Sequence, residues 1–383
     1  MSIAKLRLMT IVGTRPEIIR LSQIIRKCDL YFDHIMVHTG QNYDYTLNQI
    51  FFEDLSLRAP DHYLEAVGKD LGETIGNIIA RSYKLMAELK PDALLILGDT
   101  NSCLSAIAAK RLHIPIFHME AGNRCFDECL PEETNRRIVD HIADVNLCYS
   151  ENARRYLNRE GTAWERTYVT GSPMAEVLGR NLSQIENSGI LQKLGLKQKQ
   201  YILLSAHREE NIDTEKNFIS LMSAVNAMAE KYDMPILYSC HPRSKKFIEQ
   251  RGFVFHRNVI QHEPLGFHDY NHLQMNAYAV VSDSGTLPEE ASYFLSIGKP
   301  IAAVCIRTST ERPEALDKGN FILAGITTGQ VLQAVDTAVS MNGHGDLGIP
   351  VPDYADMNVS NKVVKIIQSY TGIVDRMVWR KDL

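Results

Sequence analysis

Apolar and polar positions alternate in blocks along most of this 383-residue chain. Short apolar runs, typical of strands buried on both faces, are separated by longer stretches with helical periodicity. The apolar runs lie at 6–13, 34–40, 92–99, 114–120 and 144–150, and again at 201–207, 234–240, 258–263, 277–285 and 299–305. Helical patterns in the first half include 16–27, 72–90, 101–112 and 131–142. Two successive series of βα units predict an α/β protein with two Rossmann-like domains that face a central cleft.

The expected domain boundaries follow from a break in this alternation. After about residue 170 the apolar runs give way to a polar stretch, NLSQIENSGILQKLGLKQKQ. The chain is also longer than one hydrophobic core normally serves. We therefore expect an N-terminal domain at 1–172 and a C-terminal domain at 173–360. The helical tail at 361–383 is expected to pack back on the N-terminal domain.

The bulk composition, 45% hydrophobic and 23% charged, is typical of a globular protein. A formal net charge of −5 without a long basic block gives a nucleic-acid role no electrostatic support. Seven scattered cysteines, an odd number without a disulfide-framework spacing, indicate a reducing compartment, so we expect a cytoplasmic protein. The first apolar run is too short for a signal peptide, and none approaches the roughly 20 residues of a membrane span.

One short pattern recurs at three places, as GTRPE at 13–17, GTLPE at 285–289 and TERPE at 310–314. Thr14 and Thr286 each precede a glutamate by three residues, which is the spacing of a capping box with proline in the first turn. Each pattern predicts a strand that turns sharply into a helix whose N-terminus could bind an anion. Capping boxes also occur in helices that bind nothing, so this pattern alone leaves both interpretations open.

Several cofactor motifs are absent from the sequence. It contains no G-x-G-x-x-G after a strand, no G-x-x-x-x-G-K-[ST] and no H-E-x-x-H, so we expect no bound cofactor. His118 and Glu120 precede Cys125 and Cys129, which is similar to the zinc deaminase signature H-x-E…P-C-x-x-C. The cysteine spacing here is C-x-x-x-C and the proline follows it, so we expect no metal site.

Carboxylates at strand ends suggest acid–base chemistry instead. Asp99 and Glu120 end two successive strands, where ligands bind in open α/β sheets, and Glu132 begins the next helix. If these carboxylates meet at one edge, their like charges should raise the pKa of at least one of them. Glu128 and Glu133 are more simply interpreted as a solvated helix start.

The second half offers groups that suit a diphosphate. His207 and Arg208 follow a buried strand, where the histidine could titrate near neutrality and the arginine could hold a phosphate. A purely structural histidine is the alternative at this position. Glu290 could reach ribose hydroxyls. The backbone N–H groups expected to face the diphosphate are those of Ser284, Gly285 and Thr286.

Seven motifs in one order resemble the non-hydrolysing UDP-N-acetylglucosamine 2-epimerases, a family with a GT-B-like fold of two Rossmann-type domains. The similarity extends from about residue 6 to about residue 370. The motifs are GTRPE at 13–17, GDT at 98–100, HMEAG at 118–122, PEE at 131–133, AHRE at 206–209, SDSG at 282–285 and TERPE at 310–314.

The resemblance implies a reaction and a set of residues. Members of the family expel UDP from C1 while C2 loses its proton, and then return UDP with the proton on the other face. The implied catalytic residues are Asp99, Glu120, Glu132 and His207. The implied UDP contacts are Arg15, Ser284, Gly285, Glu290 and Arg312, with Tyr270 a looser match for the ring on uracil. The resemblance also implies a UDP-activated N-acetyl amino sugar as substrate, no cofactor and a homodimer.

The chain departs from the common family pattern at several motif positions. Arg20 replaces a lysine and cannot shuttle a proton, so we expect it to act as an electrostatic or phosphate-binding group. Asn123 and Cys125 replace leucine and threonine, Glu209 replaces an arginine and Thr286 replaces a glycine. With the segment at 39–55, these changes resemble the UDP-N-acetyl-L-fucosamine synthase branch of capsule and O-antigen synthesis. That branch epimerises C2 of UDP-2-acetamido-2,6-dideoxy-L-talose, and UDP-N-acetylglucosamine is the alternative substrate.

Two other functions share parts of this pattern. A GT-B glycosyltransferase has the same nucleotide site but moves the sugar to an acceptor without exchanging the C2 proton. A catalytically silent sugar-nucleotide sensor would bind UDP-sugar, yet it has little use for clustered carboxylates.

Overall fold

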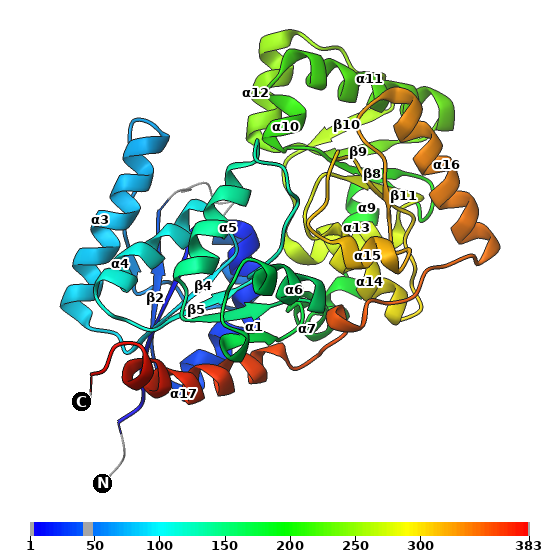
Figure 1. The fold of residues 1–383 in the computed structure, drawn as a ribbon. Helices are drawn as coiled ribbons and strands as arrows, with labels where there is room; N and C mark the ends of the chain where they lie inside the picture. Colours follow the sequence, from blue (N-terminus) through cyan, green and yellow to red (C-terminus); the bar gives the residue numbers. More distant parts are fainter. Residues whose placement is uncertain (1–3, 41–48, 382–383) are drawn as a thin grey trace. The chain divides into compact units, whose positions relative to one another are not determined.

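A computed structural model describes residues 4–40 and 49–381 of the chain. It forms two compact units, one made of Met1–Val177 with Asp356–Leu383 and the other of Leu178–Ala355 (Figure 1). These divisions lie a few residues from the expected boundaries at 172/173 and 360/361. None of the helices in the described part of the chain combines the length and apolar character that crossing a bilayer requires.

Unit 1 is built on a parallel sheet. In the described residues its strand order is β3-β2-β1-β4-β5-β6-β7, and every neighbouring pair is parallel. The strands are β1 (Arg7–Val12), β2 (Asp33–His38), β3 (His62–Tyr63), β4 (Ala93–Leu97), β5 (Ile116–Met119), β6 (Val145–Cys148) and β7 (Thr167–Val169). The order reverses between β1 and β4, where Thr10 is in register with both Met36 and Leu95.

Helices cover the sheet of unit 1, and the last helix of the chain is among them. These helices are α1 (Arg15–Tyr31), α2 (Gln49–Asp54), α3 (Leu71–Leu89), η2 (Asn101–Leu104), α4 (Ser105–Arg111), α5 (Pro131–Ile142), α6 (Glu151–Arg159), η3 (Trp164–Arg166) and α17 (Val359–Met377). Helix α7 (Met174–Arg180) spans the division between the units. Figure 1 shows α17, in red, beside α1, in blue, and the two helices are in contact.

Unit 2 repeats the same plan. Its described strands are ordered β10-β9-β8-β11-β12-β13 with parallel pairing throughout. They are β8 (Ile202–Ser205), β9 (Ile236–Ser239), β10 (Val259–His262), β11 (Ala279–Ser282), β12 (Ala303–Cys305) and β13 (Ile322–Leu323). The helices are α8 (Leu182–Glu186), α9 (Ile190–Leu194), α10 (Glu209–Ile212), α11 (Glu215–Tyr232), α12 (Pro242–Arg251), α13 (Phe267–Asn276), α14 (Leu287–Ser296), α15 (Pro313–Asp317), α16 (Thr328–His344) and η4 (Pro352–Tyr354).

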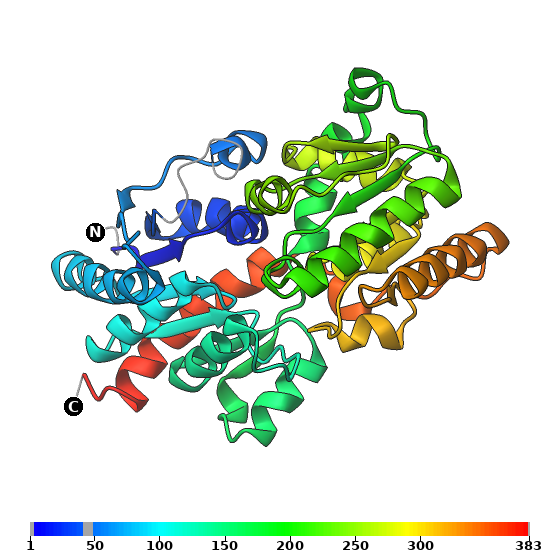
Figure 2. The same ribbon diagram turned by 90° about the horizontal axis from the view of Figure 1, so that it is seen from above.

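The hydrophobic cores of the two units explain why the predicted strands are apolar at nearly every position. In unit 1 the buried side chains of β1 and β4 pack against α3, α4 and α5. In unit 2 those of β8, β9 and β11 pack against α11 and α16, the latter drawn in orange in Figure 2. Because helices lie on the faces of a parallel sheet, central strands such as Ala93–Leu97 are buried at every position.

The ten strands predicted from apolar runs are confirmed. The strands that the pattern missed are β3, β7 and β13, which have two or three residues and therefore no detectable period. The polar stretch after residue 180 contains two helices of five residues each, α8 and α9, which is too short for a helical pattern to show.

Candidate active site

Both sheets have a point where strand order reverses, and ligands of open α/β sheets bind at the carboxyl ends of strands there. In unit 1 this point lies between β1 and β4, and in unit 2 between β8 and β11. The predicted site residues follow these strands or their neighbours, so each unit gathers its own set.

The turn after β1 is organised by Glu17. This buried carboxylate accepts hydrogen bonds from the backbone N–H groups of Gly13, at 3.1 Å, and Thr14, at 2.8 Å, which confirms the predicted capping box at Thr14. It also accepts hydrogen bonds from the hydroxyls of Thr100, at 3.0 Å, and Ser102. Burial raises the pKa of Glu17, although these hydrogen bonds act in the opposite direction. Glu17 therefore ties the β1–α1 turn to the loop that carries Asp99.

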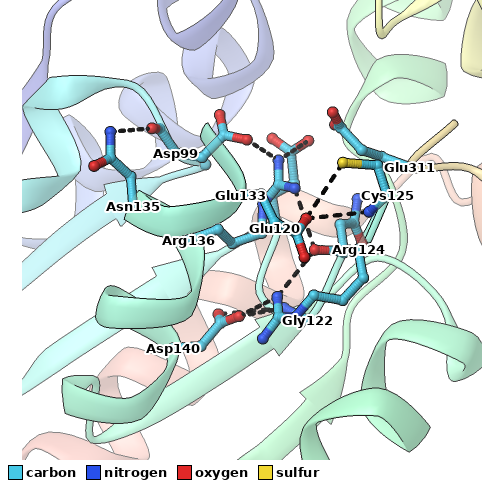
Figure 3. Close-up of polar contacts among 12 residues, drawn as sticks. Asp99, Glu120, Gly122, Arg124, Cys125, Glu133, Asn135, Arg136, Asp140 and Glu311 are labelled. Atoms are coloured by element: carbon cyan, nitrogen blue, oxygen red, sulfur yellow. Dashed lines mark hydrogen bonds and ion pairs between the residues drawn. The ribbon is translucent and has the colours of Figure 1, made fainter. Parts of the chain in front are cut away.

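Glu120 lies at the carboxyl end of β5, 1% exposed and in the left-handed conformation with φ of 62°. Its Oε2 pairs with Arg20 Nη1, and its Oε1 lies 3.6 Å from Arg136 Nη2. The same Arg136 nitrogen pairs with Asp99 Oδ2, so the guanidinium bridges two of the predicted catalytic carboxylates (Figure 3). The Glu120 carboxylate also lies close to the backbone of Gly98, because a Cβ added to Gly98 would lie 3.1 Å from Glu120 Oε2.

Two arginines add positive charge that the sequence interpretation does not include. Arg20 pairs with Glu120, and Arg136 lies beside both Glu120 and Asp99. A buried carboxylate needs such a partner, because an uncompensated buried charge is strongly destabilising. Glu132 is half-buried in the first turn of α5. It precedes Arg136 by four residues and therefore lies on the same face of the helix.

A buried cluster of polar side chains lies on the elements that flank Glu120 in the sequence. The His118 Nε2 lies 2.7 Å from the Gly98 carbonyl oxygen, and its Nδ1 lies 2.9 Å from Asp140 Oδ1. Arg124 Nη1 lies 2.7 Å from Asp140 Oδ2. Burial alone would raise the pKa of Asp140, but the hydrogen bond from His118 and the charge of Arg124 hold it below its usual value.

The cysteine-containing loop between β5 and α5 is held by a buried glutamate of α5. Within the described residues no group of three His, Cys, Asp or Glu side chains is arranged to hold a metal ion. Glu133 is 2% exposed and accepts a hydrogen bond from the Cys125 backbone N–H at 3.1 Å (Figure 3). The prediction that Glu133 is solvated is therefore wrong, whereas Glu128 is indeed exposed. Cys129 is exposed as well.

In unit 2 the strand-end histidine is held by a buried aspartate. Asp283 Oδ2 accepts hydrogen bonds from the backbone N–H groups of His207 and Arg208, both at 2.8 Å, and from Asn211 Nδ2 at 3.2 Å. Its Oδ1 lies 3.3 Å from His207 Nδ1. The His207 ring, which is 26% exposed, also stacks on His241 with ring centroids 5.6 Å apart.

The turn between β11 and α14 differs from the prediction. Thr286 accepts no capping hydrogen bond, so the capping box predicted there is wrong. Glu289 is instead fully buried and its Oε1 lies 3.4 Å from Arg312 Nε. The backbone N–H of Ser284 donates to Ser282 Oγ at 3.0 Å, and that of Thr286 to Ser284 Oγ at 3.3 Å. Serine hydroxyls thus accept hydrogen bonds from two of the three N–H groups that were expected to face a diphosphate.

The remaining predicted nucleotide contacts lie on several elements. Arg15 is half-buried at the start of α1, with its guanidinium 5.6 Å from the centroid of the Phe51 ring. Arg208 caps α10, and Tyr270 is half-buried in α13. Glu290 is buried in α14, where its Oε2 accepts a hydrogen bond from Gln274 Nε2 at 2.8 Å.

Sequence reasoning missed the residues that hold the predicted ones. Arg136 lies in the middle of a helix, where no motif marks it, although its spacing of four from Glu132 was a usable signal. Asp283 lies inside the SDSG motif, but the motif points to the serine and glycine beside it as the ligand contacts. The capping-box spacing predicts the local role of Glu17, whereas its contacts with Thr100 and Ser102 depend on the tertiary fold.

Comparison with known proteins decides the family. The sequence model of the family described as UDP-N-acetylglucosamine 2-epimerase matches residues 26–368. The chain belongs to this family. A solved UDP-N-acetylglucosamine 2-epimerase from Rickettsia bellii is 46% identical with a TM-score of 0.88, covering 98% of this chain and 99% of that one.

Two curated relatives show the range of the family. A UDP-N-acetylglucosamine 2-epimerase of Methanococcus maripaludis is 33% identical over 369 residues, covering 93% of this chain and 97% of the relative. A UDP-2,3-diacetamido-2,3-dideoxy-D-glucuronate 2-epimerase of Pseudomonas aeruginosa is 31% identical over 338 residues, covering 87% and 92%. The chain is therefore a UDP-sugar 2-epimerase, an isomerase, with the GT-B-like fold of two Rossmann-like domains that the motifs implied.

The comparisons do not separate the branches of the family. Of the segment at 39–55 that suggested the fucosamine branch, residues 41–48 lie outside the described part of the structure.

Proposed function

We propose that the protein inverts C2 of a UDP-activated 2-acetamido sugar by eliminating UDP and adding it back. The C2 proton leaves as the C1–O bond to UDP breaks, which produces a 2-acetamidoglycal and free UDP. The UDP oxygen then returns to C1 while a proton reaches C2 from the opposite face. The sugar is neither oxidised nor reduced overall, so the reaction needs no redox cofactor.

The observation that carries this proposal is the Glu120 carboxylate, buried at the carboxyl end of β5 and paired with Arg20 and Arg136. A carboxylate sequestered at the ligand-binding edge of a sheet suits proton transfer better than simple binding. We assign proton transfer and stabilisation of the intermediate to Asp99, Glu120, Glu132 and His207. We assign the UDP-sugar contacts to Arg15, Arg20, Arg208, Tyr270, Ser284, Gly285, Thr286, Glu290 and Arg312.

The proposed substrate is UDP-2-acetamido-2,6-dideoxy-L-talose, which C2 inversion converts to UDP-N-acetyl-L-fucosamine for capsule or O-antigen synthesis. The support is the set of motif departures, chiefly Arg20, Asn123 and Cys125. Asn123 and Cys125 lie in the loop that follows Glu120, and the Asn123 carbonyl accepts a hydrogen bond from Arg136 at 3.2 Å. UDP-N-acetylglucosamine is the alternative, supported by the names of the Rickettsia and Methanococcus relatives. We further propose that the enzyme acts in the cytoplasm as a homodimer.

Proton NMR in deuterated water tests the reaction and the sugar together. One sample contains UDP-2-acetamido-2,6-dideoxy-L-talose and the other contains UDP-N-acetylglucosamine. Deuterium at C2 and a new C2 epimer in the first sample alone support the fucosamine branch. The same signals in the second sample indicate a more general 2-epimerase. Absence of exchange in both would refute both proposed substrates and favour another UDP-sugar, such as the one in the name of the Pseudomonas relative.

The Glu120→Gln variant tests the role of the carboxylate. We expect it to bind UDP nearly as well as the wild type, because the nucleotide contacts are assigned to other residues. Turnover should fall by at least two orders of magnitude, the range attributed to a positioned acid or base. A large loss of UDP affinity with turnover intact would show that Glu120 is a binding residue, as in a sensor.

A further inference from the structure

The loops after β8 and β11 are joined by Asp283, a carboxylate of the SDSG motif to which the family resemblance assigned no role. Asp283 is fully buried, and its Oδ2 accepts hydrogen bonds from two successive backbone N–H groups and from the Asn211 side chain. These contacts fix the backbone at His207 and Arg208. They leave Oδ1, which is also buried and has no geometrically good hydrogen bond, facing His207 Nδ1 at 3.3 Å.

We infer that Asp283 is a positioning residue that holds His207 in the tautomer carrying its proton on Nδ1. A buried carboxylate oxygen requires a donor. The Nδ1–H group is that donor, because an ionised carboxylate can only accept hydrogen bonds. The opposite ring nitrogen, Nε2, is then the one that can take up or release a proton.

The backbone contacts make this orientation specific. Asp283 accepts the N–H of His207 itself, so the carboxylate holds the main chain and the side chain of one residue at the same time. The His241 ring packs on the His207 ring at an interplanar angle of 26° and limits its rotation. Carboxylate–histidine pairs of this kind set ring orientation and tautomer in other acid–base sites, and apo geometry there is often loose.

This inference rests on the proposed function, since positioning matters to the reaction only if His207 takes part in it. Nitrogen-15 NMR of the ligand-free protein tests the tautomer without any activity measurement. The neutral His207 ring should show a pyrrole-type shift at Nδ1 and a pyridine-type shift at Nε2. In the Asp283→Asn variant the amide oxygen can keep the backbone N–H groups while its NH2 faces Nδ1, so the two shifts should exchange.

Two controls separate this effect from general damage to the fold. The His272 Nδ1 donates to the Ile185 carbonyl at 2.7 Å, so its signals should remain unchanged in every variant. The Asn211→Ala variant removes a donor from the other oxygen of Asp283 and should leave the His207 tautomer as it is. An Nε2-protonated ring in the wild type, or a tautomer that Asp283→Asn leaves unchanged, would overturn the inference.

A double-mutant cycle with His207→Ala connects the tautomer to turnover, measured as deuterium entry at C2. Asp283→Asn should lower turnover by about 10²-fold or more when His207 is present and have little further effect when it is absent. Equal losses in both backgrounds would mean that Asp283 does not act through His207. If the wild type exchanges no deuterium, the proposed function fails, while the NMR result still decides the role of Asp283.

Discussion

Removing Arg20 should expose how strongly the Glu120 carboxylate depends on its counter-charge. Both side chains are nearly inaccessible, 9% and 2% exposed, and their ion pair is buried. Breaking a buried pair by removing one partner typically costs about 3–5 kcal/mol, because the other charge is left uncompensated. In the Arg20→Met variant, Arg136 Nη2 remains 3.6 Å from the other carboxylate oxygen. We therefore expect the low end of that range, about 3 kcal/mol.

Tryptophan fluorescence is a suitable assay because it reports on unit 1 alone. The two tryptophans of the chain, Trp164 and Trp379, both belong to that unit. With a slope of about 2–3 kcal/mol per molar urea, a loss of about 3 kcal/mol lowers the urea midpoint by about 1–1.5 M. The Arg155→Met variant is the matched control, since Arg155 is 66% exposed and its pair with Glu151 should contribute only about 0.3–0.5 kcal/mol.

The stability change caused by Glu120→Gln, compared in the wild-type and Arg20→Met backgrounds, distinguishes a charge effect from a packing effect. Glu120→Gln should destabilise the wild type, because it leaves the Arg20 guanidinium buried without its carboxylate. In the Arg20→Met background the same change removes a buried charge that has lost its Arg20 partner, so the double variant should be more stable than Arg20→Met alone. Destabilisation by Glu120→Gln to the same extent in both backgrounds would refute the reasoning, since independent packing losses simply add.

Three further outcomes follow from the described residues of unit 1. Gly122→Ala should destabilise unit 1 by more than the about 1–2 kcal/mol that an alanine in the left-handed conformation costs, because the new Cβ would lie 2.4 Å from the Ala153 carbonyl oxygen. Gly161 also has a positive φ, but its new Cβ would meet nothing within 4 Å, so Gly161→Ala should show only that backbone cost in the same urea experiment. Burial raises the pKa of Glu17 in the folded state. Its contribution to the free energy of unfolding is therefore fully present below the pKa of the unfolded chain, and it is lost as the pH rises through the pKa of the folded protein. Urea unfolding of the wild type and Glu17→Gln from pH 4 upward should therefore show a wild-type advantage that shrinks with pH, and a growing advantage would contradict this. In a thiol titration of the native protein Cys129 should react first, whereas Cys103 and Cys148, whose pKa values burial raises, should react only after unfolding.

The backbone plan could be predicted because strands of a parallel sheet carry their own signal. Ala93–Leu97 is apolar at all positions only because helices cover both faces of the sheet, so the run itself identifies the strand. Once the strand ends are known, Asp99 and Glu120 must lie at the carboxyl edge of the sheet, where the structure has them. The two-residue strands β3 and β13 have no such signal, because they exist only through pairing with neighbours that are distant in sequence.

The predicted site residues could be located in this way, but their partners could not. Whether Glu289 turns back to Thr286 or reaches Arg312 depends on where α15 packs, and the capping-box spacing is the same in both cases. The same limit applies to Asp283, which the motif places beside a serine and glycine without showing that it receives the backbone of His207.

A physical rule would have reduced this gap. A carboxylate buried at a strand end requires a compensating group, and a guanidinium is the most suitable one because it stays charged and offers several donors. Applied to the sequence, this rule points to arginines on the helices that follow the strands. Arg20 and Arg136 both fit, since each lies within two turns of the start of its helix. Arginine in place of the family lysine at position 20 therefore keeps a permanent positive charge beside Glu120, which agrees with our proposal that the carboxylates and His207 transfer the proton.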